Sequence, residues 1–342
     1  MTAPTTLRRV TPAGLQVLPA DADRDRWLVE RRNYLCSSDM AAVLGVTQYS
    51  TALHVYLEKK GEAPQDEAGE PALWGTVLED AVAREWTRRN RSVTRRVGLI
   101  RNVDRPWQAC TLDRVVVECP DGNGPCALEI KCRSAFKAGQ WKREVPDDVM
   151  AQVYWAMTTA GYQHMHVAVL IGGNDYRQFT VKLDKTIAAD IVTAGEKFWT
   201  EHVLAATEPA PPATGYGEVL GELYDALNPD REGNQHLTDL DEQLEAEEAL
   251  REYELARIQE TRAVQAKKDA RAKLLKVLGP CDTAIIEDRL AYTYLAHDKA
   301  GFDMNRLKAE YPEAYAACCT TTEVRTLRIA KSYKIQNDTT EV

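Results

Sequence analysis

The sequence predicts an α+β fold, in which a central mixed sheet is flanked by helices and a helical C-terminal extension with short strands follows. Two patterns indicate this fold. Between residues 25 and 206, amphipathic helical segments alternate with short apolar strands, an order typical of helices packed on a sheet. After residue 238, strong helix formers run up to Gly279-Pro280, a pair that ends helices. The chain has 342 residues, of which 44% are hydrophobic, so it can bury a sizeable core.

Changes in composition predict four parts of the chain. Residues 1–24 are rich in Thr, Pro and Ala and should form a loose arm, and residues 25–206 should form the core domain. The Pro-rich stretch TEPAPPATG opens a linker over 207–238. Residues 239–342 should form the extension: one long or broken helix to about 278, then short strands within 283–297 and 323–335 around a small helix at about 303–317.

The elements of the core domain follow from local signals. The segment 37–45, SSDMAAVLG, should begin a capped helix, because Ser and Asp side chains satisfy free backbone amides. Segment 74–89 repeats apolar residues at 74, 78, 82 and 86 and predicts an amphipathic helix. Strands should follow at about 108–118 and 126–133 in the same sheet. A helix bounded by Pro146 and Gly161 comes next, and two strands joined by a Gly-Asn-Asp turn close the domain.

Composition narrows the functional classes. The formal net charge of -9 argues against a generally basic DNA coat. The sequence shows no targeting segment and no apolar run of membrane-spanning length, so we expect a cytosolic protein and no membrane partner. The eight cysteines contain no CxxC pair, so we expect reduced thiols that fill small apolar gaps, with neither a zinc site nor disulfides.

The strand CALEIKCR, residues 126–133, carries the chemistry. Because side chains alternate across a strand, Glu129 and Lys131 share one face while Ile130 lies on the other. Pairing with the preceding strand would bring Asp113 next to Glu129, and two such carboxylates repel unless a cation lies between them. Oxygen ligands favour Mg²⁺ or Mn²⁺, and Lys131 could orient an attacking water. The alternative is a pair of surface salt bridges, which the E-x-K tripeptide alone would favour.

Other residues add to this pattern. Glu79 lies on the flank of its helix next to the apolar stripe, although a solvated acid near a helix start would look the same. Gln152 shares a face with apolar residues and needs polar partners, as a satisfied core glutamine also would. The stretch 84–101 has seven arginines against one acid and could neutralise phosphates, or be a solvated helix end.

With these residues in this order, the chain resembles the PD-(D/E)XK nuclease superfamily, and within it the lambda exonuclease and YqaJ-like viral recombinase family. The resemblance covers about residues 25–200 and is carried by the segments RRNYLCSSDMAAVLG, WGTVLEDAVAREW, TLDRVVVE, LEIKC and VMAQVYWAMTTAG. It implies that Arg31 and Ser38 hold a 5′ phosphate. It implies a catalytic set of Glu79, Asp113, Glu129, Lys131 and Gln152. The implied metal ligands are Asp113, Glu129, the backbone carbonyl of Ile130, and Glu79. The arginines that would track the DNA backbone include Arg88, Arg89, Arg95 and Arg96.

The resemblance also implies an activity. Such a protein would be a Mg²⁺-dependent 5′-to-3′ exonuclease, with Mn²⁺ as a substitute, that acts on linear double-stranded DNA. It would release 5′ mononucleotides and leave 3′ single-stranded overhangs for phage-type recombination. It would form a homotrimeric ring and work beside a single-strand annealing protein, as a phage or prophage protein in the cytoplasm of a bacterial host.

The sequence departs from the family pattern at two places. Arg114 follows Asp113 where the family usually has glycine, and the loop before Glu129 has an extra Asp-Gly-Asn-Gly turn at 121–124. Two other readings stay open. One is a different nuclease on the same core, either an endonuclease or a Cas4-like enzyme with an iron-sulfur cluster, which needs four ligating cysteines. The other is a catalytically silent protein that binds DNA ends.

Overall fold

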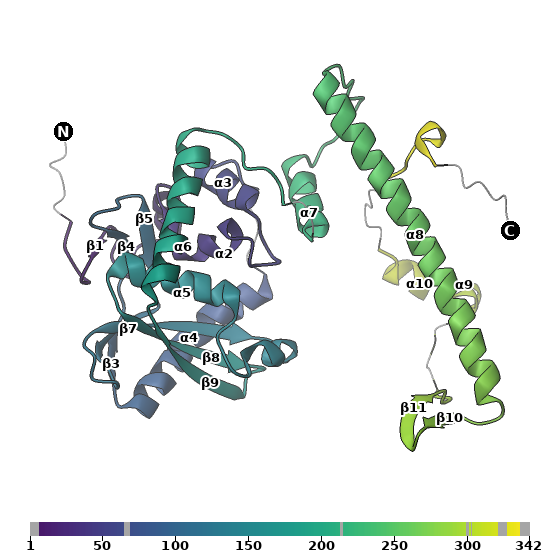
Figure 1. Ribbon diagram of the computed structural model, residues 1–342, viewed down its shortest axis with the longest axis horizontal. Helices are drawn as coiled ribbons and strands as arrows, with labels where there is room; N and C mark the ends of the chain where they lie inside the picture. Colours follow the sequence, from purple (N-terminus) through teal and green to yellow (C-terminus); the bar gives the residue numbers. More distant parts are fainter. Residues whose placement is uncertain are drawn as a thin grey trace. The chain divides into compact units, whose positions relative to one another are not determined.

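The protein divides into two compact units, Met1–Arg231 and Glu232–Val342. The structure is a computed structural model that describes residues 7–64, 69–212, 215–298, 301, 303–320 and 327–335. The first unit contains both sheets of the core domain, and the second contains the long helix α8 (Leu240–Leu278) and a β-hairpin (Figure 1).

A five-stranded mixed sheet forms the centre of the first unit. Its strand order is β3-β6-β7-β8-β9. Strands β6 and β7 pair antiparallel, β7 and β8 pair parallel, and β8 and β9 pair antiparallel. The strands are β3 (Val93–Arg95), β6 (Arg114–Glu118), β7 (Cys126–Arg133), β8 (His164–Ile171) and β9 (Asp175–Lys182). The predicted mixed sheet and its flanking helices are confirmed.

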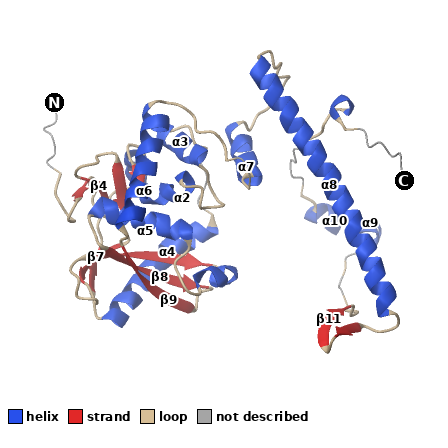
Figure 2. Ribbon diagram, in the orientation of Figure 1, coloured by secondary structure: helices blue, strands red, loops and turns tan. Residues whose placement is uncertain are grey.

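Helices cover both faces of this sheet. On one face, Val82 and Trp86 of α4 (Glu70–Asn90) pack against Leu128 and Ile130 of β7. On the other face, α5 (Asp147–Ala160) and α6 (Lys185–Phe198) enclose the larger core cluster (Figure 2). The first two turns of α4 are largely exposed, so the apolar stripe predicted from residue 74 begins only at Val82.

Gly195 allows α6 to approach α5 closely. A Cβ atom at this position would lie 2.4 Å from the ring of Trp155, closer than carbon atoms can pack. Trp155 is fully buried and donates its indole hydrogen to the carbonyl of Ala109 at 3.0 Å. The helix α6 itself was not predicted, although Asp184 caps its first amides.

A second, four-stranded sheet corrects two predictions. Its order is β1-β4-β5-β2, with bounds β1 (Gly14–Gln16), β2 (Leu35–Cys36), β4 (Leu99–Asn102) and β5 (Gln108–Thr111). The loose arm predicted for 1–24 is wrong at β1, because β1 pairs antiparallel with β4; residues 1–6 lie outside the described part. The single strand predicted over 108–118 is also wrong. It divides at Asp113 into β5 and β6, which belong to different sheets.

Short helices complete the first unit. They are α1 (Arg24–Arg31), α2 (Met40–Val43) after a 3-10 turn (Ser37–Asp39), α3 (Ala52–Lys60) and α7 (Gly217–Leu227). The capped helix start predicted at 37–45 is present as the 3-10 turn and α2. Helix α7 lies inside the predicted linker 207–238, where Leu223 is buried in the main core cluster. Just before it, Tyr216 donates its hydroxyl hydrogen to the carbonyl of Gly45 at 2.9 Å.

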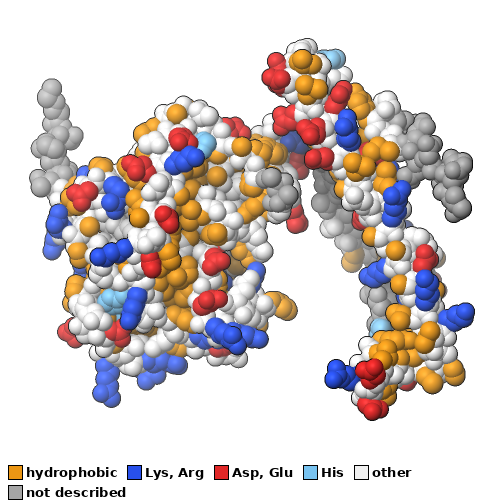
Figure 3. Space-filling model, viewed as in Figure 1, with side chains coloured by type: hydrophobic (Ala, Val, Ile, Leu, Met, Phe, Trp, Pro, Cys, Tyr) orange, Lys and Arg blue, Asp and Glu red, His pale blue; other side chains and the backbone are white. Residues whose placement is uncertain are grey.

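In the second unit, α8 is one unbroken helix of 39 residues. Asp239 accepts hydrogen bonds from its first amides and Gly279 ends it, which confirms the predicted helix. Strands β10 (Thr283–Ile286) and β11 (Arg289–Thr293) form the hairpin, and α9 (Met304–Glu310) and α10 (Pro312–Cys318) follow. The predicted strand at 323–335 is wrong for 327–335, which hold only a 3-10 turn; 323–326 lie outside the described residues. Exposed hydrophobic side chains are interspersed with charged ones on the face of this unit seen in Figure 3.

Two further expectations concern membranes and thiols. None of the helices among the described residues combines the length and the apolar character needed to cross a bilayer. The eight cysteines are free thiols, but Cys281, Cys318 and Cys319 are exposed, so the expectation that the thiols fill apolar gaps is wrong for these three. The expectation that the cysteines lack a metal-site arrangement is also wrong, because Cys119 and Cys126 lie together with His164 and His166. The two thiols are seven residues apart and the histidines come from another strand, so a search for CxxC pairs misses them.

Candidate active site

Strand β7 and helix α5 bring three predicted residues into direct contact. The ammonium of Lys131 lies 2.5 Å from Oε1 of Glu129 and donates to Oε1 of Gln152 at 2.9 Å. The amide of Gln152 in turn donates to Oε1 of Glu129 at 2.8 Å. Glu129 is only 1% exposed, so these contacts satisfy a buried carboxylate. The interpretation of Glu129 and Lys131 as a pair of surface salt bridges is therefore wrong, since Glu129 is not on the surface.

Asp113 lies beside Glu129 and Lys131, at the point where the chain leaves β5 and before β6 begins. Between β5 and β6, the Asp113 carboxylate accepts a hydrogen bond from the backbone N–H of Ile130 at 2.6 Å. The side chain of Asp113 thus accepts the hydrogen bond that a backbone carbonyl of a paired strand would otherwise accept. Burial, and next the negative charge of Glu129, raise the pKa of Asp113 well above its usual range. Two carboxylates in such surroundings favour a bound cation.

The donor set fits a hard divalent cation. The two carboxylates of Asp113 and Glu129 supply oxygen only, which is the ligand chemistry of Mg²⁺ and Mn²⁺. Burial and the nearby charge of Glu129 both raise the pKa of Asp113, and a cation bound by the two carboxylates would stabilise their charged forms in this place. The role of the Ile130 carbonyl as a further ligand stays a prediction.

Glu79 is held by Arg114, the residue at which this chain departs from the family pattern. Arg114 donates from Nη1 to Oε1 of Glu79 at 2.6 Å and from Nη2 to Oδ1 of Asp80 at 2.5 Å. Its side chain is 5% exposed, whereas that of Glu79 is 31% exposed. Arg114 therefore ties the acids of α4 to the start of β6, and the negative charge of Glu79 still acts on Asp113.

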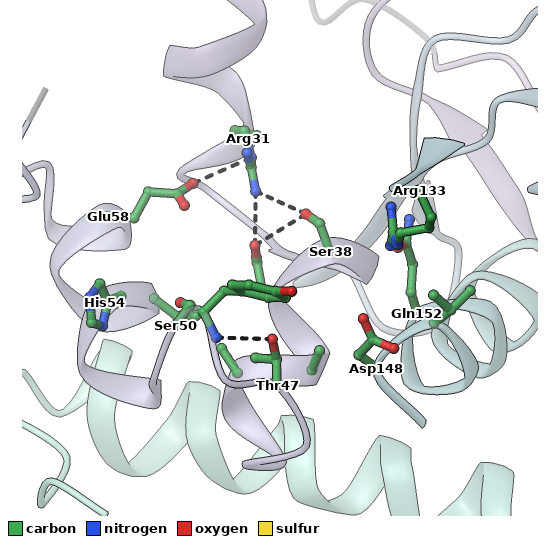
Figure 4. A pocket seen from close by; sticks show the side chains of 15 residues that line it. Arg31, Ser38, Thr47, Ser50, His54, Glu58, Arg133, Asp148 and Gln152 are labelled. Atoms are coloured by element: carbon green, nitrogen blue, oxygen red, sulfur yellow. Dashed lines mark hydrogen bonds and ion pairs between the residues drawn. The ribbon is translucent and has the colours of Figure 1, made fainter. Parts of the chain in front are cut away.

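The predicted phosphate-binding pair lies in a neighbouring cavity of about 360 Å³ (Figure 4). Arg31 donates to Oγ of Ser38 at 3.1 Å, so the two residues do meet. Arg31 and Ser38 lie on one side of the cavity, and Arg133, Asp148 and Gln152 on the other. Gln152 thus lines this cavity and also contacts Glu129 and Lys131.

Buried ion pairs hold Arg31 in place. Asp39 lies 2.8 Å from Arg31 and 2.6 Å from the ammonium of Lys59, whose side chain is fully buried. Burial alone would raise the pKa of Asp39, but Lys59 and Arg31 outweigh it and lower that pKa below its usual value. The pairing of Asp39 with Lys59 could not be predicted from the sequence, because no local pattern links these positions twenty residues apart. Arg133 could have been predicted as a site residue, because it shares the strand face of Glu129 and Lys131.

The arginine-rich stretch makes many contacts within the protein. Arg88 and Arg89 pair with Glu85 at 2.8 and 2.6 Å, and Arg89 also lies over the ring of Tyr176. Elsewhere in the stretch, Arg96 pairs with Asp80 at 2.9 Å and Arg95 donates to a backbone carbonyl. These contacts offset part of the positive charge, and a role of these arginines in DNA binding stays a prediction.

Comparison with known proteins identifies proteins that are similar to part of this chain. Residues 26–163 match the family described as "YqaJ-like viral recombinase domain". The uncharacterized protein YqaJ of Bacillus subtilis (strain 168) is 31% identical over 196 residues, which are 56% of this chain and 60% of that protein's length.

Among solved structures, the chain resembles the alkaline exonuclease LHK-Exo from Laribacter hongkongensis, determined alone and in complex with dAMP. Both comparisons give 19% identity and a TM-score of 0.45, and they cover 54% of this chain and 94% of the exonuclease.

Proposed function

Because residues 26–163 match the YqaJ-like viral recombinase domain, we propose that this protein is a metal-dependent nuclease that digests linear double-stranded DNA from its 5′ ends. One observation carries the proposal. Lys131, Glu129 and Gln152 contact one another, and Asp113 accepts a hydrogen bond from the residue between Glu129 and Lys131. This arrangement suits the hydrolysis of a phosphodiester, because the carboxylates can hold a cation and the ammonium can orient the nucleophile.

The residues divide the chemical work as follows. Mg²⁺ held by Asp113 and Glu129, with Mn²⁺ as a substitute, would supply Lewis-acid stabilisation of charge on the scissile phosphate. Lys131 orients the attacking water and offsets negative charge as it develops, since its ammonium is already fixed by two oxygen acceptors. Gln152 holds both Lys131 and Glu129, so it sets the direction of the ammonium. Glu79 contributes negative charge beside Asp113.

The cavity beside this site supports the proposed dependence on DNA ends. Arg31 and Ser38 present a cation and a hydroxyl, which suit a terminal 5′ phosphate. Because Gln152 lines the same cavity, a phosphate bound there lies next to the catalytic group. Anchoring a terminal phosphate would place the first phosphodiester bonds at Lys131. Digestion would then release 5′ mononucleotides and leave a 3′ single strand, largely independently of sequence.

The biological setting is part of the same proposal. A 3′ single strand is the substrate of a single-strand annealing protein, so we propose that this protein acts in phage-type recombination beside such a partner. A homotrimeric ring around the duplex is the assembly that the family resemblance suggests. The Cas4-like alternative finds no support in the described residues, where two thiols, and not four, lie together.

The test uses purified full-length protein with Mg²⁺ on two substrates of equal sequence. A 5′-phosphorylated linear duplex should be degraded from its ends, and a covalently closed circle should stay intact. Labels at the 5′ or 3′ ends should show that the 5′ label is released first as a mononucleotide. Lys131→Met should abolish the activity. Lys137→Met is the control, because it replaces a lysine in a neighbouring segment, and it should leave the activity unchanged. Equal cleavage of the circle would contradict the exonuclease proposal, and end binding without cleavage would indicate a silent DNA-end binding protein.

A further inference from the structure

Four side chains that the proposed nuclease reaction does not use meet beside the hairpin between β6 and β7. They are Cys119, Cys126, His164 and His166, and one ligating atom of each lies within 4.8 Å of all the others. The Sγ atom of Cys119 lies 3.1 Å from Nε2 of His164 and 3.5 Å from Nε2 of His166. Around tetrahedral zinc, sulfur and nitrogen ligands are separated by roughly 3.5 Å, as follows from the usual bond lengths.

The local sequence explains why the four residues meet. Cys119 follows β6 and Cys126 begins β7, so the hairpin loop places both thiols at one end of the strands. His164 and His166 alternate on β8 and therefore face the same side. The parallel register pairs Leu128 with His166, which sets Cys126 beside His164 on the face covered by α4. The site is thus on the opposite face of β7 from Glu129.

The surroundings resemble those of a structural metal site. Cys126 is fully buried, and His164 and His166 are 6% and 4% exposed, while Cys119 is partly accessible and leaves a way in for an ion. The other ring nitrogen of His166, Nδ1, lies 3.0 Å from Oγ1 of Thr180, which leaves Nε2 directed at the cluster. The ring of Trp86 lies 5.1 Å from that of His166 and covers this side.

We propose that Cys119, Cys126, His164 and His166 bind one zinc ion. Two thiolates and two imidazoles are the ligands of tetrahedral structural zinc, and two thiolates balance its charge in a buried place. All four positions are protein ligands, so the site is structural and has no open position for a substrate. The ion links the β6–β7 hairpin to β8. It thereby holds the strand that carries Glu129 and Lys131, which lie about 10 and about 17 Å further along β7 by the rise of a strand.

The first test measures metal content. Full-length protein produced with zinc in the medium and dialysed against metal-free buffer should hold about one zinc per chain by mass spectrometry of the elements. Cys119→Ser and His164→Ala should reduce this to near zero. The matched controls Cys281→Ser and His236→Ala replace exposed residues of the same types and should keep it. Asp113→Asn with Glu129→Gln should also keep it, which separates this zinc from any metal at the active site.

The second test identifies the ligands directly. Adding Co²⁺ to protein stripped of zinc should produce the visible absorption of tetrahedral cobalt and a thiolate charge-transfer band in the near ultraviolet, and zinc should displace both. Cys126→Ala should lose the thiolate band; if this buried variant does not fold, the partly accessible Cys119→Ser answers the same question. The proposal would be overturned if the purified protein held no zinc and showed no cobalt absorption bands. A Cys119 variant with unchanged zinc content would also overturn it. So would a disulfide between Cys119 and Cys126 in protein purified without oxygen.

Discussion

The guanidinium of Arg114 lies 2.6 Å from the carboxylate of Glu79 and is almost completely buried there. It also pairs with Asp80 at 2.5 Å, so one cation joins two consecutive acids of α4 to the first residue of β6. Asp113, the residue just before Arg114, is a predicted metal ligand. A fixed positive charge therefore lies next to a site that should attract a divalent cation.

Replacing Arg114 should strengthen metal binding at the active site. In Arg114→Ala, Glu79 is released and a positive charge is removed, so the Mg²⁺ concentration for half-maximal nuclease activity should fall roughly three- to tenfold. Titration of activity with Mg²⁺ measures this. Arg84→Ala is the control, because Arg84 pairs with Asp80 on the exposed side of α4 and has no contact with Glu79 among its ion pairs. An unchanged Mg²⁺ dependence in a folded Arg114 variant would make Arg114 purely structural.

Gln152 should act by positioning Glu129 and Lys131. Gln152→Leu removes both hydrogen bonds at nearly constant volume, and we expect kcat to fall about 10- to 100-fold with little change in KM. Steady-state digestion of a linear duplex gives both constants. Gln178→Leu removes a glutamine that bonds to Asn90 on the far side of the sheet and should leave kcat unchanged. A rise in KM alone would instead place Gln152 in DNA binding.

Ser38 should contribute to recognition of the 5′ phosphate. Wild-type protein should digest phosphorylated ends faster than hydroxyl ends, and Ser38→Ala should reduce this ratio roughly three- to tenfold, the value of one ordinary hydrogen bond. The ratio is measured on two duplexes that differ only at the terminal group. Ser50 lines the same cavity, so Ser50→Ala serves as the control. If both variants reduce the ratio equally, the cavity acts by shape and not through Ser38.

Asp39 should stabilise the fold in a pH-dependent way. Asp39→Asn leaves Lys59 buried without its closest negative partner, so the free energy of unfolding should fall by about 3–5 kcal/mol at neutral pH. The folded-state pKa of Asp39 is lowered, so its stabilisation is complete above the unfolded pKa of about 3.9 and is lost as pH falls through the folded value. Urea unfolding at several pH values should show the difference between wild type and variant shrinking below about pH 4.

The faces on which Glu129, Lys131 and Gln152 lie could be predicted because they depend on local rules. Alternation along β7 placed Glu129 and Lys131 on one face, and helical periodicity placed Gln152 among apolar residues that are indeed buried. The long helix α8 was also predictable, because Asp239 and Gly279 are residue types that commonly begin and end a helix.

Other features could not be predicted because they depend on long-range contacts. The break at Asp113 results from a side chain that bonds to the backbone of Ile130, seventeen residues away. The partners of Arg114 lie more than thirty residues before it on α4. Pairing of β1 with β4 joins segments more than eighty residues apart, and neither strand is longer than four residues. Propensity in such short segments is weak, and tertiary pairing decides the structure.

The alternation of β7 limits how this protein can vary in length during evolution. The even positions 126, 128 and 130 face α4, and the odd positions 127, 129 and 131 face the side of α5. An insertion or deletion of a single residue within the strand would move the side chains beyond that point to the opposite face, or force a bulge there. Gains and losses of residues among relatives should therefore fall in the loop 120–125, and the strand itself should keep a constant length.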